Sequence, residues 1–181
     1  MNRPDSQAER FLRTLDIVHR EGKHLLYSWQ RLFGQGHIDR SWVESLDGQP
    51  ELAERLEAFV SRFGRMQDTI ADKLLPRWLI ALAEKPASQI ETLNRAERLG
   101  VLDDVEQWLT ARALRNRLIH EYMEDPETFA GDLLLARDYT PMLIDVYNRV
   151  RAYAITPMAL DTAKLPGELA SPDPSFANRR P

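Results

Sequence analysis

Four polar side chains that could do chemistry lie close together in the sequence ALRNRLIHEYMEDP, residues 113–126. Arg115, Asn116, His120 and Tyr122 stand there among leucines and an isoleucine. Histidine exchanges protons near neutral pH, and arginine stabilises the negative charge that develops on a phosphorane. An arginine–histidine pair therefore suits cleavage of a phosphodiester without a metal ion, and we expect neither a metal nor another cofactor.

Helical geometry separates these side chains if residues 103–122 form one helix. Arg115 and His120 are then about 140° apart, because successive residues turn by about 100°. Two apolar stripes are predicted, which together cover roughly half of the helix. The first consists of Leu102, Val105, Leu109, Ala113, Asn116 and His120. The second consists of Trp108, Ala111, Arg115, Ile119 and Tyr122, and the solvent face includes Arg117 and Glu121. One stripe can face the bundle, which leaves the other free for a partner.

An arginine on an apolar stripe needs a partner for its charge. In one interpretation the polar residues form a structural network, in which Arg115 pairs with a carboxylate such as Asp68 and His120 bonds to a backbone carbonyl. In another, a two-fold dimer brings two arginines and two histidines into one cleft. The surface predicted to cover the second copy consists of Trp108, Ala111, Ile119 and Tyr122. The residues alone leave both interpretations open.

Apolar residues recur at helical spacing through most of the chain. Long amphipathic helices are predicted over residues 11–32 and 52–74, and Pro76 should kink or end the second. A short helix follows, with the capping-box pair Ser88 and Glu91 at its start. Asp103 should start the helix that carries the polar residues, and Asp125 with Pro126 should start the last one. This pattern predicts an all-α, up-and-down bundle of four to five helices.

The bundle is expected to occupy residues 1–155. Gly22 lies within the apolar stripe of the first helix, where close approach by a neighbouring helix would explain a glycine. Residues 156–181 are rich in Pro, Ala, Ser and Asp. We expect them to form an irregular C-terminal tail, either mobile or draped as an arm over the bundle surface.

Composition narrows the possible classes of protein. The 181 residues carry a formal net charge of −4, which argues against binding nucleic acid by overall charge but allows a local basic site. Cysteine is absent, so no thiol nucleophile or disulfide is available. No apolar run is long enough to cross a bilayer, and the first ten residues do not resemble a signal peptide. A cytoplasmic protein without a membrane partner is expected.

The segment RNRLIHEY resembles the signature of the HEPN superfamily, in which an arginine and a polar residue precede a histidine. The fuller pattern Arg-x4-His-x-Tyr is similar to that of HepT-like toxins, and it matches at Arg115, Asn116, His120 and Tyr122. The resemblance covers roughly residues 8–153. The long loop at residues 34–50 and the tail after residue 155 depart from the compact pattern of that family.

The resemblance implies a homodimeric, metal-independent ribonuclease toxin with a composite site. Arg115 and His120 would be catalytic, Asn116 would support His120, and Asp68 would orient Arg115. A small nucleotidyltransferase would be the antitoxin and would transfer AMP to Tyr122. RNA would be the substrate.

The alternative is a non-catalytic binding subunit, whose arginine-rich cleft docks a nucleotidyltransferase or a nucleotide. Metal chemistry has weaker support. Glu21 and His24 form one Glu-x-x-His pair, whereas a di-iron bundle needs two such pairs.

Overall fold

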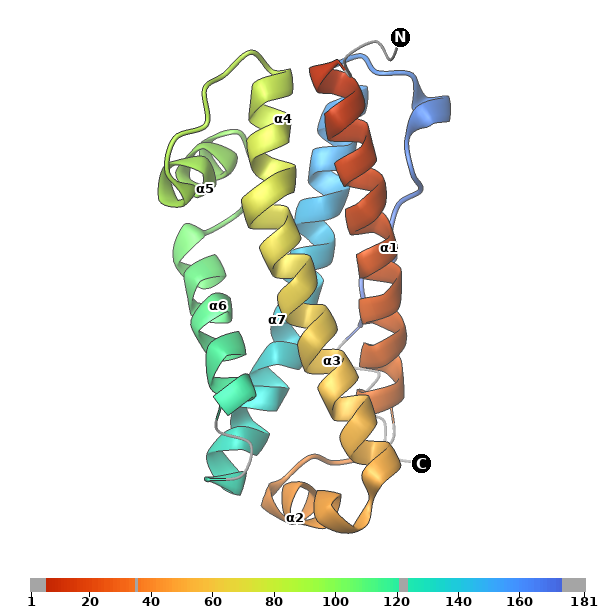
Figure 1. Ribbon diagram of the computed structural model, residues 1–181, viewed down its shortest axis with the longest axis vertical. Coiled ribbons are helices and arrows are strands. Elements are labelled where there is room, and N and C mark those ends of the chain that lie inside the picture. Colours follow the sequence, from red (N-terminus) through yellow and green to blue (C-terminus); the bar gives the residue numbers. More distant parts are fainter. Residues whose placement is uncertain (1–5, 35, 121–123, 174–181) are drawn as a thin grey trace, which may run out of the picture.

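The computed structural model describes residues 6–34, 36–120 and 124–173, and across these ranges the chain is all-α and contains no strand, as predicted. Four long segments form the bundle: α1 (Gln7–Phe33), α3 (Pro50–Thr69), α6 (Val105–His120) and α7 (Pro126–Ile155). Figure 1 shows α1 and α3 running side by side, with α7 behind them and α6 at the left edge. The described ranges hold seven α-helices and not four or five, because short helices at Arg40–Glu44 and Leu75–Ala81 add to the predicted set.

The helix that starts with α3 continues past Pro76. A π-helical turn at Ile70–Leu74 joins α3 to α4 (Leu75–Ala81), so the proline lies in the first turn of a new helical segment. The Leu75 N–H donates to the Ile70 carbonyl, five residues back. Proline is tolerated in a first turn because its missing N–H has no partner there in any case. The predicted end of the helix at Pro76 is therefore wrong, and the helical path is kept by widening one turn.

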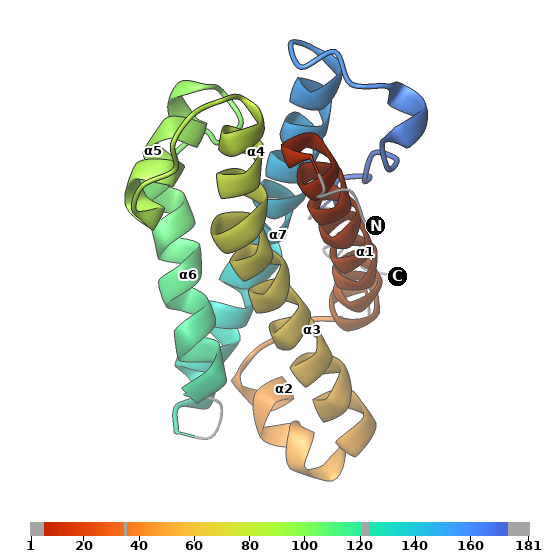
Figure 2. The same cartoon turned by 45° about the horizontal axis from the view of Figure 1, so that its top comes forward.

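The shorter helices lie at the two ends of the bundle (Figures 1 and 2). Helix α2 (Arg40–Glu44) and a 3-10 turn at Ser45–Gly48 form the loop between α1 and α3. Helix α5 (Gln89–Arg98) begins with the predicted capping box of Ser88 and Glu91.

Helix α6 begins one residue later than the sequence suggested. The Asp104 carboxylate, and not that of Asp103, accepts hydrogen bonds from the backbone N–H groups of Glu106 and Gln107. Asp103 pairs with Arg149 of α7 instead.

Large apolar side chains from all four long segments meet in one continuous core. The largest fully buried ones include Phe11, Phe33, Phe59, Phe63, Trp78, Trp108, Phe129 and Tyr147. This core holds α6 and α3 at a fixed separation along the surface where the candidate site lies.

The chain after α7 forms an arm that lies along the bundle up to residue 173. Asn148 of α7 forms two hydrogen bonds with the backbone of Leu169, and the Tyr147 hydroxyl donates to the Gly167 carbonyl at 2.6 Å. The Leu169 side chain packs directly on Gly22 of α1, where Met66 of α3 is also in contact range. The close approach expected at Gly22 is therefore made chiefly by the arm and not by a helix.

None of the helices in the described part of the chain combines the length and the apolar character needed to cross a membrane.

Candidate functional site

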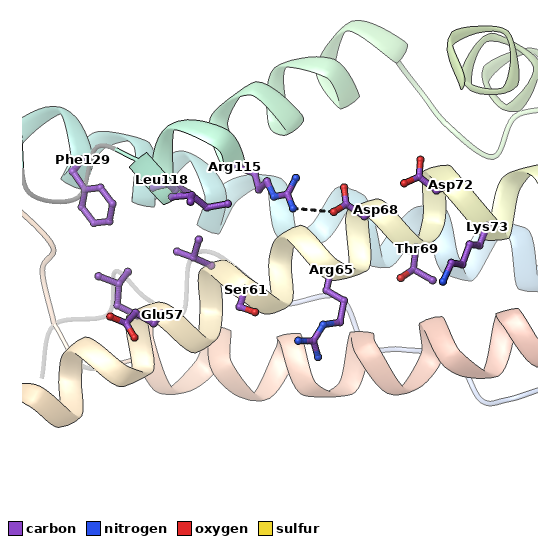
Figure 3. Close-up of a pocket in the computed structure, with 13 residues that line it drawn as sticks. Glu57, Ser61, Arg65, Asp68, Thr69, Asp72, Lys73, Arg115, Leu118 and Phe129 are labelled. Atoms are coloured by element: carbon purple, nitrogen blue, oxygen red, sulfur yellow. Dashed lines mark hydrogen bonds and ion pairs between the residues drawn. The ribbon is translucent and has the colours of Figure 1, made fainter. Parts of the chain in front are cut away.

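Arg115 of α6 is fixed by an ion pair with Asp68 of α3. One guanidinium nitrogen, Nη2, lies 2.9 Å from Asp68 Oδ2, which is the contact expected from the sequence (Figure 3). The two side chains are 25% and 39% exposed, so the pair is neither buried nor fully solvated. A guanidinium held in this way keeps donors available for a second anion.

Gly64 gives Arg115 the space to reach Asp68. A Cβ atom at position 64 would lie 2.6 Å from Arg115 Nε and 3.1 Å from its Cγ. The arginine side chain therefore runs directly over the backbone of α3, and any larger residue at position 64 would displace it.

The ion pair forms part of a groove of about 710 Å³ that runs along α3 and its π turn, with α6 on one side and the side chains of Arg65 and Lys73 on the side toward α1 (Figure 3). Leu118 and Phe129 line the groove toward one end, with Glu57 near them (Figure 3), and Ile119 also lines it. The other polar and charged lining side chains are Ser61, Arg65, Asp68, Thr69, Asp72, Lys73 and Arg115. The volume is within the range of small-molecule and cofactor sites.

Helix α6 is rotated relative to the expectation from the sequence. Trp108 and Ala111 are buried in the protein's own core, together with Leu114 and Leu118. They cannot cover a second copy, so the dimer surface predicted from the second stripe is wrong for these two residues. The reason is that α6 packs against both α3 and α7, which buries residues at spacings of three and four on a single side.

The first stripe is correspondingly exposed over much of its length. Leu102 and Val105 are buried as predicted, but Leu109, Ala113 and Asn116 face outward. Ile119 is 52% exposed at the rim of the groove. Leu109 and Ala113 thus form an apolar strip on the surface of α6, and the Asn116 amide lies next to it.

Of the predicted site residues, Arg115, Asp68 and Asn116 have side chains among those that the structure describes. Arg115 and Asp68 meet in the groove, whereas Asn116 lies on the exposed side of α6. His120 is the last residue of α6. Its side chain, as well as Glu121 and Tyr122, lies outside the described residues.

Arg117 has a structural partner and does not simply face solvent, as the sequence suggested. Its Nε and Nη2 atoms donate to the two carboxylate oxygens of Asp132 at 2.8 and 2.9 Å. Asp132 is 7% exposed, so its charge would be left without compensation if the arginine were removed. This pair joins α6 to α7.

A second polar bridge, not predicted from the sequence, joins α6 to the π turn. Arg112 donates to the side chain of Gln89, and Gln89 donates to Asp72. Asp68 and Asp72 are four residues apart and both point toward α6 (Figure 3). Asp68 binds Arg115 directly, and Asp72 is linked to Arg112 through Gln89. Polar residues recur at steps of three and four along α3, and this pattern could have indicated a polar contact with α6. The same pattern is typical of an ordinary solvated helix face, so it does not distinguish the two.

Glu21 of α1 lies at the side of α3 opposite to α6. The Thr69 hydroxyl donates to Glu21 Oε1 at 3.0 Å, while Oε2 is buried and has no partner among the described residues. Burial raises the pKa of Glu21 above its usual range, and the positive charges of Arg65 and Lys73 offset part of this increase.

Within the described ranges, no group of three or more histidine or acidic side chains is arranged to hold a metal ion. No protein-family model, curated protein or solved structure matches this chain. The HEPN-like expectation therefore rests on the motif at residues 115–122 and on the helical pattern around it.

Proposed function

We propose that this protein is a metal-independent endoribonuclease whose site is built on α6. The observation that carries the proposal is the placement of Arg115. It is oriented by Asp68, it lines an open groove, and it is five residues before His120 at the end of the same helix. An oriented guanidinium next to an open groove is suited to a phosphate group.

The proposed reaction is attack of a ribose 2′-oxygen on the adjacent phosphorus. His120 acts as the general base that accepts the 2′-hydroxyl proton, and Arg115 stabilises the phosphorane charge. The bond from phosphorus to the 5′-oxygen breaks, and that oxygen takes up a proton. The products are a 2′,3′-cyclic phosphate and a 5′-hydroxyl, and Asn116 supports His120 from one turn earlier on the helix.

A homodimer would bring the histidine of one copy to the arginine of the other. Helical geometry separates Arg115 from His120 by about 140°, which a single helix does not overcome. The exposed strip of Leu109, Ala113 and Asn116 supports a two-fold contact along α6, because apolar side chains there have no cover from the chain itself.

We propose further that the activity is that of a cytoplasmic toxin. Its antitoxin would be a small nucleotidyltransferase that transfers AMP to Tyr122, which blocks the site beside His120. The proposal rests on the Arg-x4-His-x-Tyr pattern at residues 115–122.

The test is an RNA-cleavage assay in the presence of a chelator. Wild-type protein should cut RNA and leave 2′,3′-cyclic phosphate ends, whereas His120→Ala should lose at least about 100-fold in rate. Equal activity of the two proteins would rule out the proposed role of His120. The matched control is His37→Ala, which alters a histidine in the loop before α2.

The second candidate is a non-catalytic subunit that docks a nucleotidyltransferase or a nucleotide. The uncovered strip on α6 also favours this function. In that case RNA is not cleaved at any protein concentration, and Arg115→Ala weakens the complex with the nucleotidyltransferase.

A further inference from the structure

The groove extends beyond the Arg115–Asp68 pair in both directions along α3. Figure 3 shows Leu118 and Phe129 at one end, and Asp72, Thr69 and Lys73 toward the other. Apart from Leu118, these residues lie outside the segment 115–122, and the proposed chemistry at the phosphorus uses none of them.

Two cations in the groove are available for an anion. Arg65 and Lys73 are exposed, and neither forms a hydrogen bond or ion pair with another residue that the structure describes. Arg115, in contrast, already holds Asp68. Arg65 and Lys73 each lie four residues from Thr69, and the three side chains follow the side of α3 that faces α1 (Figure 3).

The acidic side chains of the groove are mostly engaged elsewhere. Asp68 is bound to Arg115 and Asp72 to Gln89, while Glu57 lies toward the apolar end. Glu21 accepts a hydrogen bond from Thr69, and the positive charges of Arg65 and Lys73 favour its charged form. The charged side chains that line the groove are balanced in sign, and Arg65 and Lys73 are its two cations without an ion pair among the described residues.

The apolar end has a different character. Leu118 and Phe129 are almost fully buried, so they form a floor, and the half-exposed Ile119 forms the rim. An apolar recess with one exposed aliphatic side chain suits a flat, weakly polar group such as a nucleobase. Between the two ends, the exposed Ser61 adds a small side chain that lets a strand lie close to α3.

We propose that this groove binds a short stretch of single-stranded RNA next to the scissile phosphate. One unstacked base enters the apolar end at Leu118 and Ile119, and a neighbouring phosphate binds Arg65 and Lys73. The inference rests on the proposed function for its substrate, but it assigns binding to residues other than Arg115, Asn116, His120 and Tyr122. A base that is paired and stacked in a duplex cannot enter the apolar end, so the groove selects single strands.

Binding can be measured apart from cleavage by using His120→Ala as the background. The probe is a fluorescently labelled single-stranded oligoribonucleotide, compared with a fully base-paired RNA hairpin. Replacing both Arg65 and Lys73 with Ala should weaken single-strand binding about tenfold or more. The slope of log affinity against log salt concentration should become shallower by the amount that corresponds to the loss of about one to two phosphate contacts. Ile119→Ser should weaken single-strand binding while leaving the salt dependence unchanged.

The matched control replaces Lys85 and Lys164 with Ala, which removes the same charge from exposed positions outside the groove. Equal weakening by the two double variants would overturn the groove assignment, as would equal affinity for the hairpin and the single strand. If wild type cleaves RNA but binding is insensitive to Arg65 and Lys73, the groove assignment fails and the ribonuclease remains. If binding depends on both residues but wild type does not cleave, the groove assignment holds and the ribonuclease fails.

Discussion

Arg115 and Arg117 are two residues apart in the sequence, but their surroundings differ. Arg117 neutralises the nearly buried Asp132 and joins two helices of the core. Arg115 pairs with the more exposed Asp68 in an open groove, where a guanidinium can bind an additional anion. Arg117 is a structural position because its carboxylate partner is nearly buried, and Arg115 is the candidate functional one because it lines the groove.

Gly64→Ala tests the placement of Arg115 without removing any charge. The added methyl would lie 2.6 Å from Arg115 Nε, so the guanidinium must move away from Asp68. Alanine favours the helix by about 1 kcal/mol over glycine, so the fold should be retained. RNA cleavage should fall by about 100-fold, because a displacement on the order of 1 Å is enough to disturb a catalytic group.

The control for this variant is Gly131→Ala in α7, where an added Cβ would meet nothing within 4 Å. Rates would be measured for both variants, with circular dichroism to check their helix content. Unchanged cleavage by Gly64→Ala would show that the position of Arg115 does not limit the reaction.

Glu21 should make the stability of the protein depend on pH. Its pKa is raised by burial in the folded state, so its charged form opposes folding. Relative to Glu21→Gln, wild type should therefore be most stable below the ordinary carboxyl value of 4.5 and should lose that advantage as the pH rises through the raised pKa. Urea unfolding of both proteins from pH 4 to 7.5 would measure the difference, with the exposed Glu97→Gln as control. A difference that does not change with pH would contradict this account.

At the scale of elements, the site depends on an irregular stretch of helix. The π turn at Ile70–Leu74 allows the chain to pass Pro76 without a break, and it carries Asp72 and Lys73 at the groove. π turns are rare and occur frequently at functional sites, because the added residue redirects nearby side chains. The arm reinforces the same bundle from its other side, through Leu169 between α1 and α7.

Leu169→Ala tests whether the arm stabilises the bundle. Leu169 is 6% exposed and fills the notch above Gly22, so truncation should lower the free energy of unfolding by about 2–3 kcal/mol. Urea unfolding would measure the loss. The neighbouring Glu168→Ala should change stability by less than about 0.5 kcal/mol, because the Glu168 side chain is 75% exposed and lies 3.4 Å from Arg151. Equal effects of the two variants would mean that the leucine contact is not what holds the arm.

At the scale of the whole molecule, the proposed activity requires a second copy. The net charge of −4 does not favour RNA overall, so the available cations must be concentrated in one place. A dimer along α6 would double the arginines of the site. It would also cover the exposed Leu109 and Ala113.

Light scattering at micromolar concentration should give twice the monomer mass of 20.9 kDa. Leu109→Arg should shift the protein to monomer and abolish cleavage, because a charged side chain would lie in the apolar contact. Ile90→Arg is the matched control, since Ile90 on α5 is similarly exposed. A monomeric wild type that still cleaves RNA would exclude the composite site.

The local pattern of the sequence was sufficient for the helical class and the capping box at Ser88, and it made Asp68 one candidate partner for Arg115. These features follow from spacings of three and four residues and from the need to pair a partly buried charge. The path through Pro76 depended instead on a π turn that periodicity does not reveal.

The rotation of α6 and the position of the arm were decided only by tertiary packing. Apolar residues cover about half of α6, so several rotations would bury similar area, and contacts with α3 and α7 select the one that buries Trp108 and exposes Asn116. The sequence by itself determined a helical protein with an arginine and a histidine near the end of one helix. The tertiary structure decided which side of that helix faces the groove, because burial depends on neighbours that are distant in the chain.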